Sequence, residues 1–403
     1  MLTVILVFYY LNTKQALTVN EYYLKADISP SRSSTNNNST ISNDGCGRIN
    51  NRNSSTWRNL TQFEIADSTA VQICLKRLGT FHPHDKYATA ISKIGLNCST
   101  PVNVEILRST LSRYETVWLH GDSVMEQTFY TLACMMNSSI TGLPTEADLG
   151  GPKKMRWTVN LGGQGRLIEK FTYTHAQGRT EFRFSRYGIM WGLQDNLYKY
   201  DFPFAVRTLT SKDIIFTTGA SSHFAAGQAS QFEKALEFIS SQSKLANATI
   251  YLLEPTPEEW PTTNGMWTKS CIFRCGCKAL TEERLLGHGK FITKDIAKDK
   301  QYTDTVGKPE TEFFHRLYPK MNTSKLAGGD CIPNCLPNSW RTDFVRKWEK
   351  NITSDKLHIV PIYWQLASIK NGHTGRGHGD CTHRNLYATE LMLFQLVRSI
   401  LDS

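Results

Sequence analysis

Residues 116–136 read TVWLHGDSVMEQTFYTLACMM, and this stretch decides the fold of the chain. Residues 116–120 are a short, mostly apolar run that ends at Gly121, a pattern typical of a buried strand. From residue 124 to residue 136, apolar residues recur at helical spacing. The stretch therefore predicts a buried strand, a Gly-Asp-Ser turn and a helix.

The sequence on the C-terminal side of this stretch continues the alternation. Apolar runs at 214–216, 249–253 and 358–363 predict further strands, and residues 228–245 and 386–401 read as amphipathic helices. Pro361 favours an edge strand or the end of a strand. Strands that alternate with helices predict an α/β fold whose mostly parallel sheet is covered on both faces. In such sheets, sites form at the carboxyl ends of the strands.

Cysteines and glycosylation sequons both indicate an oxidising compartment. The number of cysteines is even, which suits full disulfide pairing with a connectivity that the sequence leaves open. The cysteines are Cys46, Cys74, Cys98, Cys134, Cys271, Cys275, Cys277, Cys331, Cys335 and Cys381. N-glycosylation sequons are about twice as frequent as the roughly four that composition predicts by chance. They begin at Asn37, Asn38, Asn53, Asn59, Asn97, Asn137, Asn247, Asn322 and Asn351. We therefore expect a Golgi-lumenal or secreted glycoprotein.

Four segments are expected along the chain. Residues 1–16 begin with an apolar run too short to span a bilayer, which predicts a signal peptide or a truncated signal anchor. Residues 17–60 are rich in Ser, Thr and Asn and predict a glycosylated stalk. Residues 61–111 predict a cysteine-containing, disulfide-tied extension, and residues 112–403 the catalytic domain. The formal net charge of +10 could attract acidic glycans, although Lys and Arg are scattered along the chain rather than clustered. The sequence carries no nucleic-acid-binding motif.

Two short motifs carry the expected chemistry. Ser123 lies where a helix begins, and there free backbone N–H groups favour the negative charge that develops when an ester is attacked. A serine needs a general base and an orienting carboxylate. Asp380 and His383 supply both, three residues apart, just before the last expected helix. Taken separately, each motif also fits a helix cap or a surface loop.

Together the motifs resemble the SGNH (GDSL-like) superfamily, in particular its PC-esterase group. Residues 118–127, WLHGDSVMEQ, resemble the opening block of that group, and residues 372–383, GHTGRGHGDCTH, its closing block. Residues 254–265, EPTPEEWPTTNG, resemble a middle segment of some members. The group includes trichome-birefringence-like polysaccharide O-acetyltransferases, sialic acid O-acetyltransferases and neurexophilin-and-PC-esterase proteins. The resemblance covers roughly residues 112–403 and implies a three-layer α/β/α SGNH-like domain.

The resemblance also implies roles for particular residues. Ser123, Asp380 and His383 would form the catalytic triad. The plant-type members carry Asn-Thr-Gly-His after a central strand, whereas this chain has residues 217–223, TTGASSH, without the Asn. The oxyanion hole would then combine the N–H of Ser123 with Gly219 or Ser222. His223 and His373 are candidate substrate-binding residues. Gly162 and Gly163 are candidates for the glycine of the second SGNH block.

Three other patterns have competing interpretations. His373, His378, Asp380 and His383 have side chains that bind metals, but a metal-free triad already explains two of them. Cys271, Cys275 and Cys277 have a spacing that also occurs in zinc sites, although disulfides fit a lumenal chain better. The stretch at Asp330 imitates the closing block but has Pro333 in the place of the histidine.

The expected activity is O-acyl transfer, in particular O-acetyl transfer, to glycan hydroxyls or hydrolysis from them. The sequence does not separate these two outcomes. No bound cofactor or metal is expected, and acetyl-CoA or another acyl donor would be the co-substrate of a transferase. The alternative is a catalytically inactive SGNH-fold glycoprotein that binds glycans or other partners. No membrane contact is expected beyond the N-terminal segment.

Overall fold

A computed structural model describes ten parts of the chain, and the structural statements below concern these parts. They are residues 103–137, 156–161, 164–186, 196–218, 224, 226–258, 308–319, 336–367, 381–384 and 386–403. All belong to one of two compact units, Gly45–Ser138 with Leu143–Ser403. The expected leader, the stalk and most of the expected extension lie outside the described residues.

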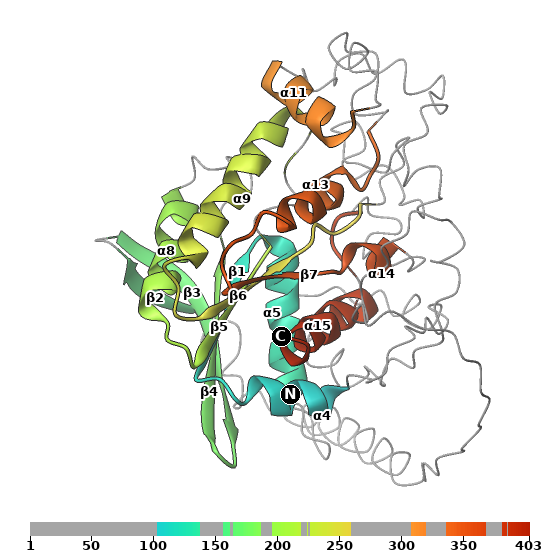
Figure 1. Cartoon of the computed structure of the whole chain (residues 1–403). Helices are drawn as coiled ribbons and strands as arrows, with labels where there is room; N and C mark the ends of the chain where they lie inside the picture. Colours follow the sequence, from blue (N-terminus) through green and yellow to red (C-terminus); the bar gives the residue numbers. More distant parts are fainter. Residues whose placement is uncertain are drawn as a thin grey trace, which may run out of the picture. The chain divides into compact units, whose positions relative to one another are not determined.

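The described strands form one mostly parallel sheet (Figure 1). They are β1 (Thr116–Gly121), β2 (Arg156–Leu161), β3 (Gln164–His175), β4 (Gly178–Arg186), β5 (Asp213–Thr217), β6 (Thr249–Leu253) and β7 (Leu357–Val360). Their order across the sheet is β2-β3-β4-β1-β5-β6-β7. The strands β4, β1, β5, β6 and β7 pair in parallel, and β3 is antiparallel to both β2 and β4. The first described strand, β1, thus lies at the centre of the sheet.

Most described helices stand between strands along the chain, and α4 precedes β1. The described helices are α4 (Val104–Leu111), α5 (Ser123–Asn137), α8 (Asn196–Thr208), α9 (Ala229–Ser243), α11 (Lys308–Leu317), α13 (Trp340–Glu349), α14 (Tyr363–Ala367) and α15 (Leu386–Leu401). A short 3-10 turn, η4 (Ala226–Gln228), precedes α9.

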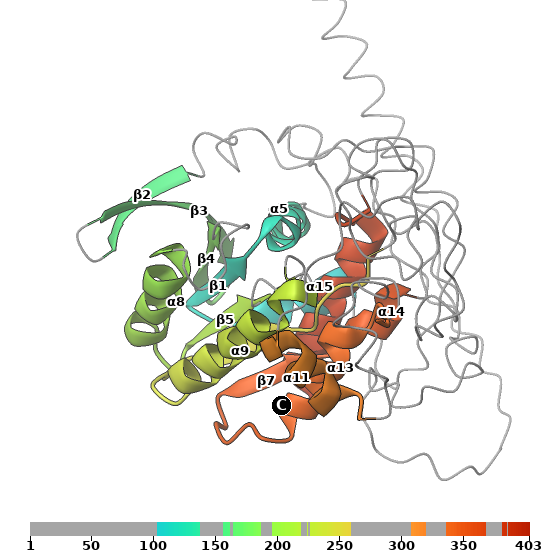
Figure 2. The ribbon, with the colours of Figure 1, turned by 90° about the horizontal axis from the view of Figure 1, so that it is seen from above.

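Helices cover both faces of the sheet because strand side chains alternate between two cores. Val117 and Leu119 of β1 lie in a core with α4, α5 and α15. Trp118, between them, lies in a second core with α8, α9, α11 and α13. The strands β5 and β6 alternate in the same way. Figure 2 shows α5 and α8 on opposite sides of β1. The expected α/β fold with a mostly parallel, doubly covered sheet is confirmed.

The expected elements are found close to their predicted positions. The strand expected at 358–363 is shorter, because β7 ends at Val360 directly before Pro361. It is also an edge strand, which agrees with the missing N–H of proline. The sequence analysis did not predict β2, β3 and β4. In β4, buried Phe182 and Phe184 alternate with half-buried Glu181 and Arg183, so this strand carries no continuous apolar run.

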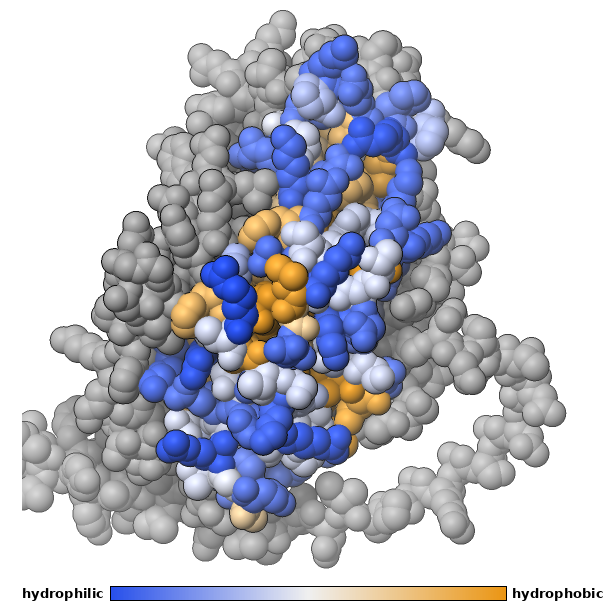
Figure 3. Space-filling model, turned by 60° about the vertical axis from the view of Figure 1, so that its left-hand side comes forward, coloured by the Kyte–Doolittle hydropathy of each residue, from blue (hydrophilic) through white to orange (hydrophobic). Residues whose placement is uncertain are grey.

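The visible described surface is mainly hydrophilic. In Figure 3, hydrophilic residues cover most of the coloured area, and hydrophobic residues show between them in smaller areas. Among the described residues, Leu245 and Leu401 are the exposed large hydrophobic side chains. No described helix combines the length and the apolar character that crossing a membrane requires.

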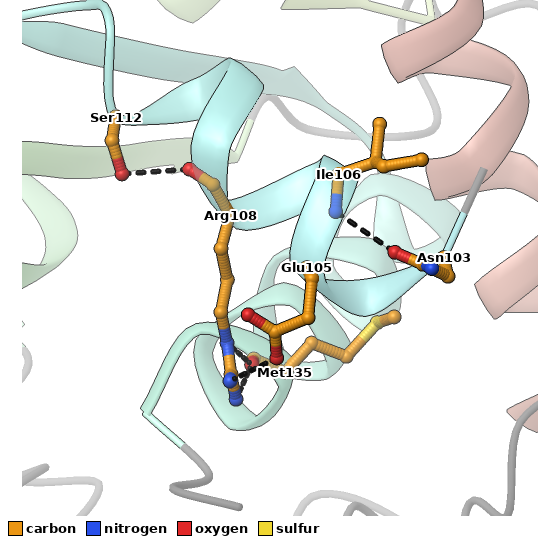
Figure 4. A network of polar contacts seen from close by, with 6 residues as sticks. All are labelled: Asn103, Glu105, Ile106, Arg108, Ser112 and Met135. Atoms are coloured by element: carbon orange, nitrogen blue, oxygen red, sulfur yellow. Dashed lines mark hydrogen bonds and ion pairs between the residues drawn. The ribbon is translucent and has the colours of Figure 1, made fainter.

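The helix α4 packs against α5 and α15, although the sequence analysis placed its residues in the extension. Asn103 caps α4 by accepting a hydrogen bond from the N–H of Ile106 (2.9 Å). Arg108 donates from Nε (2.9 Å) and Nη2 (2.8 Å) to the carbonyl of Met135, in the last turn of α5 (Figure 4). A cation is favourable there because the last carbonyls of a helix lack intrahelical donors.

Arg108→Met should lower the free energy of unfolding by about 1–2 kcal/mol, because the buried carbonyl loses its charged donor while most of the side-chain volume stays. Urea unfolding at neutral pH measures the change. Glu105→Gln is the matched control, since it removes only the ion pair of Arg108 with an exposed carboxylate (3.0 Å). That change should stay within about 0.5 kcal/mol. Equal losses in the two variants would contradict this account.

Candidate active site

Ser123 is the first residue of α5, directly beyond the carboxyl end of β1. Asp122 caps the helix. Its Oδ1 accepts hydrogen bonds from the N–H groups of Val124 (3.0 Å) and Met125 (3.4 Å). The capping role therefore falls to Asp122, and the Ser123 hydroxyl remains for another partner. Ser123 is 8% exposed.

Gly121 allows α5 and the end of β5 to lie very close to β1 where the strand turns into the helix. A Cβ atom at this position would lie 2.6 Å from Cβ of Met125 and 2.7 Å from Oγ1 of Thr218. Thr218 follows β5, and its N–H donates to the carbonyl of His120 (3.3 Å). Any larger residue at 121 would push either α5 or the end of β5 away from β1, so the glycine sets the position of Ser123.

His383 contacts Ser123, although the two residues are 260 positions apart in the sequence. The distance between Nε2 of His383 and Oγ of Ser123 is 2.6 Å. His383 lies in residues 381–384, just before α15, as the sequence predicted. Cys381, two residues earlier, is buried and disulfide-bonded, as is Cys134 of α5. The hydrogen bond therefore joins a hydroxyl at a helix N-terminus to an imidazole, the arrangement that activates a serine nucleophile.

A second contact joins the same two segments. Oε1 of Gln127 accepts a hydrogen bond from the backbone N–H of Arg384 (3.1 Å). Gln127 lies one helical turn after Ser123, and Arg384 directly follows His383. The segment that carries the imidazole is thus held to α5 at two successive residues.

The N-terminus of α5 also offers a hydrogen-bond donor. Asp122 occupies the N–H groups of Val124 and Met125 through its side chain and that of Glu126 through its carbonyl (3.0 Å). Within the described parts of the chain, the N–H of Ser123 makes no hydrogen bond. A donor beside the nucleophile is what a developing oxyanion requires.

His120, the last side chain of β1 before the turn, is a second buried histidine. Its Nδ1 lies 3.4 Å from Oγ1 of Thr217 on β5, and its ring packs 5.3 Å from that of Phe202, centroid to centroid. Burial lowers the pKa of His120 to about 3. His120 is therefore neutral over the range in which most proteins are folded, and it supports the junction rather than the chemistry.

Two ion pairs with buried carboxylates hold the segment that follows β6. Oε1 of Glu254 accepts from Nε of Arg346 (2.7 Å), and its Oε2 accepts from the N–H groups of Ile362 and Tyr363 (3.1 Å each). Glu258 pairs with Nη2 of Arg341 (2.9 Å), and both side chains are almost completely buried. The carboxyl end of β6 is thereby fixed to α13 and to the start of α14.

Tyr363 extends this network. Its hydroxyl donates to Oδ1 of Asn338 (2.6 Å), and Nδ2 of Asn338 donates to the carbonyl of Glu258 (3.0 Å). Burial raises the pKa of Tyr363 well above its ordinary value, with the Asp343 carboxylate adding to the effect. The phenol therefore stays protonated and acts as a fixed donor.

The structure brings together Ser123 and His383, two of the residues that the sequence predicted. The other predicted site residues, Asp380, Gly219, Ser222, His223 and His373, lie outside the described residues, as do Gly162 and Gly163. Of the group weighed as a metal site, only His383 is described, and the three-cysteine cluster and the Asp330 stretch are likewise outside.

The sequence analysis missed Gln127, Glu254 and Arg346. Gln127 had a usable signal, because it follows the nucleophile by four residues on one helix and so shares its face. The pairing of Glu254 with Arg346 had none, since the two are 92 residues apart.

In comparisons with known proteins, no protein-family model and no curated protein matches this chain. The case for its chemistry therefore rests on the geometry of the site.

The buried His120 should make the stability of the protein depend on pH. An unfolded histidine titrates near ~6.5, whereas folded His120 resists protonation down to about 3. Between these values the unfolded chain binds a proton that the folded chain does not, so stability falls as pH decreases, by roughly 1 kcal/mol per unit. His120→Asn, which keeps a polar atom near Thr217, should lose this contribution. Urea unfolding at pH 7 and pH 5 measures how much stability each protein loses on acidification. An equal loss in the wild type and in His120→Asn would refute the prediction.

Proposed function

We propose that this protein is a serine-dependent O-acyltransferase or O-acylesterase of the SGNH class that acts on glycan hydroxyls. The observation that carries the proposal is the 2.6 Å contact between Oγ of Ser123 and Nε2 of His383 at the N-terminus of α5. A serine hydroxyl is a poor nucleophile unless a base removes its proton, and this contact supplies the base.

In the first half-reaction, Oγ of Ser123 attacks the carbonyl carbon of an acyl donor while its proton passes to Nε2 of His383. The negative charge moves to the carbonyl oxygen and is stabilised by the N–H of Ser123. When the intermediate collapses, the leaving group takes the proton from His383. The acyl group is then esterified to Ser123.

The second half-reaction repeats these steps with a different nucleophile. A sugar hydroxyl gives its proton to His383 and attacks the acyl-serine, which yields the O-acylated glycan. If water attacks instead, the outcome is hydrolysis. The same residues serve both reactions, and access of water to the acyl-serine decides between them.

Further residues complete the proposed site. Asp380 would orient His383 and stabilise its protonated form. The N–H of Gly219 or the hydroxyl of Ser222 would add to the oxyanion hole, and His223 and His373 would contact the glycan. Thr217 and Thr218, which close β5 beside the β1–α5 junction, support this placement because Gly219 follows them directly.

Two observations support a lumenal or secreted glycoprotein as the setting. The sequon residues Asn247 and Asn351 are exposed, and Cys134 and Cys381 are disulfide-bonded. Asn247 precedes β6 and Asn351 precedes β7, whereas Ser123 follows β1. In a parallel sheet these positions lie at opposite ends, so glycans at these two asparagines would leave the proposed site accessible.

Ser123→Ala should abolish acyl transfer and hydrolysis, because the acyl group then has no attachment point. His383→Ala should lower the rate by about 10²–10⁴-fold, since the hydroxyl stays but its base is lost. Purified protein, an acetyl donor such as acetyl-CoA and a panel of neutral and acidic glycans would be incubated, and mass spectrometry would report gain or loss of acetyl groups.

Matched controls come from the same domain. Ser243→Ala removes a buried hydroxyl that donates to the carbonyl of Ser240 within α9, and His358→Ala removes a histidine of the edge strand β7. Both should keep wild-type rates. A folded Ser123→Ala protein that retains wild-type turnover would contradict the mechanism. A wild-type protein that binds a glycan but never changes its acetylation would favour the non-catalytic alternative.

Activity should fall as the pH decreases through the range near ~6.5 in which histidines ordinarily protonate. A protonated imidazole has no lone pair at Nε2 to accept the Ser123 proton, so the active fraction declines on the acid side. His120 does not contribute to this decline, because burial lowers its pKa to about 3. A pH–rate profile that stays flat down to about pH 4 would exclude His383 as the base.

A further inference from the structure

Residues 383 and 384 are both hydrogen-bonded to α5, but through different groups. His383 uses its side chain to reach Oγ of Ser123 (2.6 Å), and Arg384 uses its backbone N–H to reach Oε1 of Gln127 (3.1 Å). The first contact is the one in which chemistry is proposed. The second contact involves no reacting atom.

Helix geometry explains why these two contacts act together. Residues four apart on a helix lie on one face, about 6 Å apart along the axis. The Cα atoms of successive residues in the facing segment are ~3.8 Å apart. The length of the imidazole side chain makes up the remaining distance. The contact at Ser123 restrains the imidazole at one point of α5. The second contact fixes its distance and direction relative to α5.

We propose that Gln127 is a positioning residue, which holds His383 against Ser123 by accepting the hydrogen bond of the Arg384 N–H. This inference rests on the proposed function, because a position matters only if His383 acts as the base. The chemistry of the amide suits the task. Its oxygen accepts the backbone N–H, yet it carries no charge that would shift the proton equilibrium of the neighbouring imidazole.

The surroundings of the contact limit its freedom. Arg384 is completely buried, and Cys381, at the other end of the segment, is buried and disulfide-bonded. His383 itself is only half-buried. The segment is therefore anchored on both sides of the imidazole, and Gln127 supplies the anchor nearest to the nucleophile. A displacement of about 1 Å at this point is expected to slow the reaction by roughly 10²-fold.

Two substitutions of similar size separate the acceptor from the packing. Gln127→Met keeps the length of the side chain and removes the amide oxygen. Gln127→Glu keeps an oxygen that accepts the Arg384 N–H and adds a charge near His383. The control is Thr128→Val in the next position of α5, since the buried Thr128 hydroxyl donates to the carbonyl of Val124 (2.9 Å) within the same helix. The control loses a hydrogen bond but keeps both contacts of residues 383 and 384 with Ser123 and Gln127.

The test is the rate at which a fluorophosphonate probe labels Ser123, with fluoride leaving as the Oγ–P bond forms, in the intact disulfide-bonded protein. Hydrogen exchange of the peptide that contains Arg384 is measured in parallel. Gln127→Met should label roughly 10–100-fold more slowly and exchange faster, whereas Thr128→Val should match the wild type in both. Gln127→Glu should restore most of the labelling at neutral pH. Its acid-side decline should move to higher pH, because the added carboxylate favours the protonated imidazole.

Each outcome decides one question. If wild type is labelled and Gln127→Met labels equally fast, Gln127 is not a positioning residue. If the Met and Glu variants are equally slow at neutral pH, packing rather than the acceptor is responsible, and the proposal also fails. If the wild type takes no label at all, the proposed function is wrong, and Gln127 then has no base to position.

Discussion

The close approach of β1, β5 and α5 at Gly121 is the constraint on which the site depends. A Cβ atom there would lie within 2.6–2.7 Å of Met125 and Thr218, distances that packed atoms do not tolerate. Because the position is a glycine, β1 turns directly into α5, Asp122 caps the helix and Ser123 takes its first position. The nucleophile is therefore placed by the central strand of the sheet, which is the part of an α/β domain with most neighbours on both faces.

The rest of the described domain brings distant segments to the same edge of the sheet. The residues after β5, β6 and β7 gather at the carboxyl ends of parallel strands, and buried carboxylates fasten two of these ends. Glu254 binds Arg346 and the N–H groups of Ile362 and Tyr363 at the start of α14, and Glu258 binds Arg341. A fully buried pair such as Glu258–Arg341 adds little net stability over apolar packing but is costly to break, so it favours one arrangement over others. A fixed arrangement is what a hydrogen bond between residues 260 positions apart requires.

Local signals explain what the sequence predicted well. The apolar runs of β1, β5 and β6 and the helical spacing of α5, α9 and α15 depend on near neighbours, and they were found near their expected positions. The hairpin of β3 and β4 was missed because Phe182 and Phe184 alternate with charged residues, and such alternation becomes a strand only through its partners. Ser123 and His383 were predictable from motif chemistry. Gln127 could have been predicted from its position one helical turn after Ser123. The Glu254–Arg346 pair could not, since no pattern near either residue identifies a partner 92 residues away.

The central claim is that the contact with His383 makes Ser123 a nucleophile that carries an acyl group. Trapping that intermediate tests the claim most directly. The protein would react with an activated acetyl ester and be quenched in acid, and its peptides would be analysed by mass spectrometry. We expect one acetyl group on the peptide that contains Ser123, and acetylation at least about 10²-fold slower when His383 is replaced by alanine. Acetylation at another residue, or equal acetylation of Ser123 with and without His383, would contradict the account.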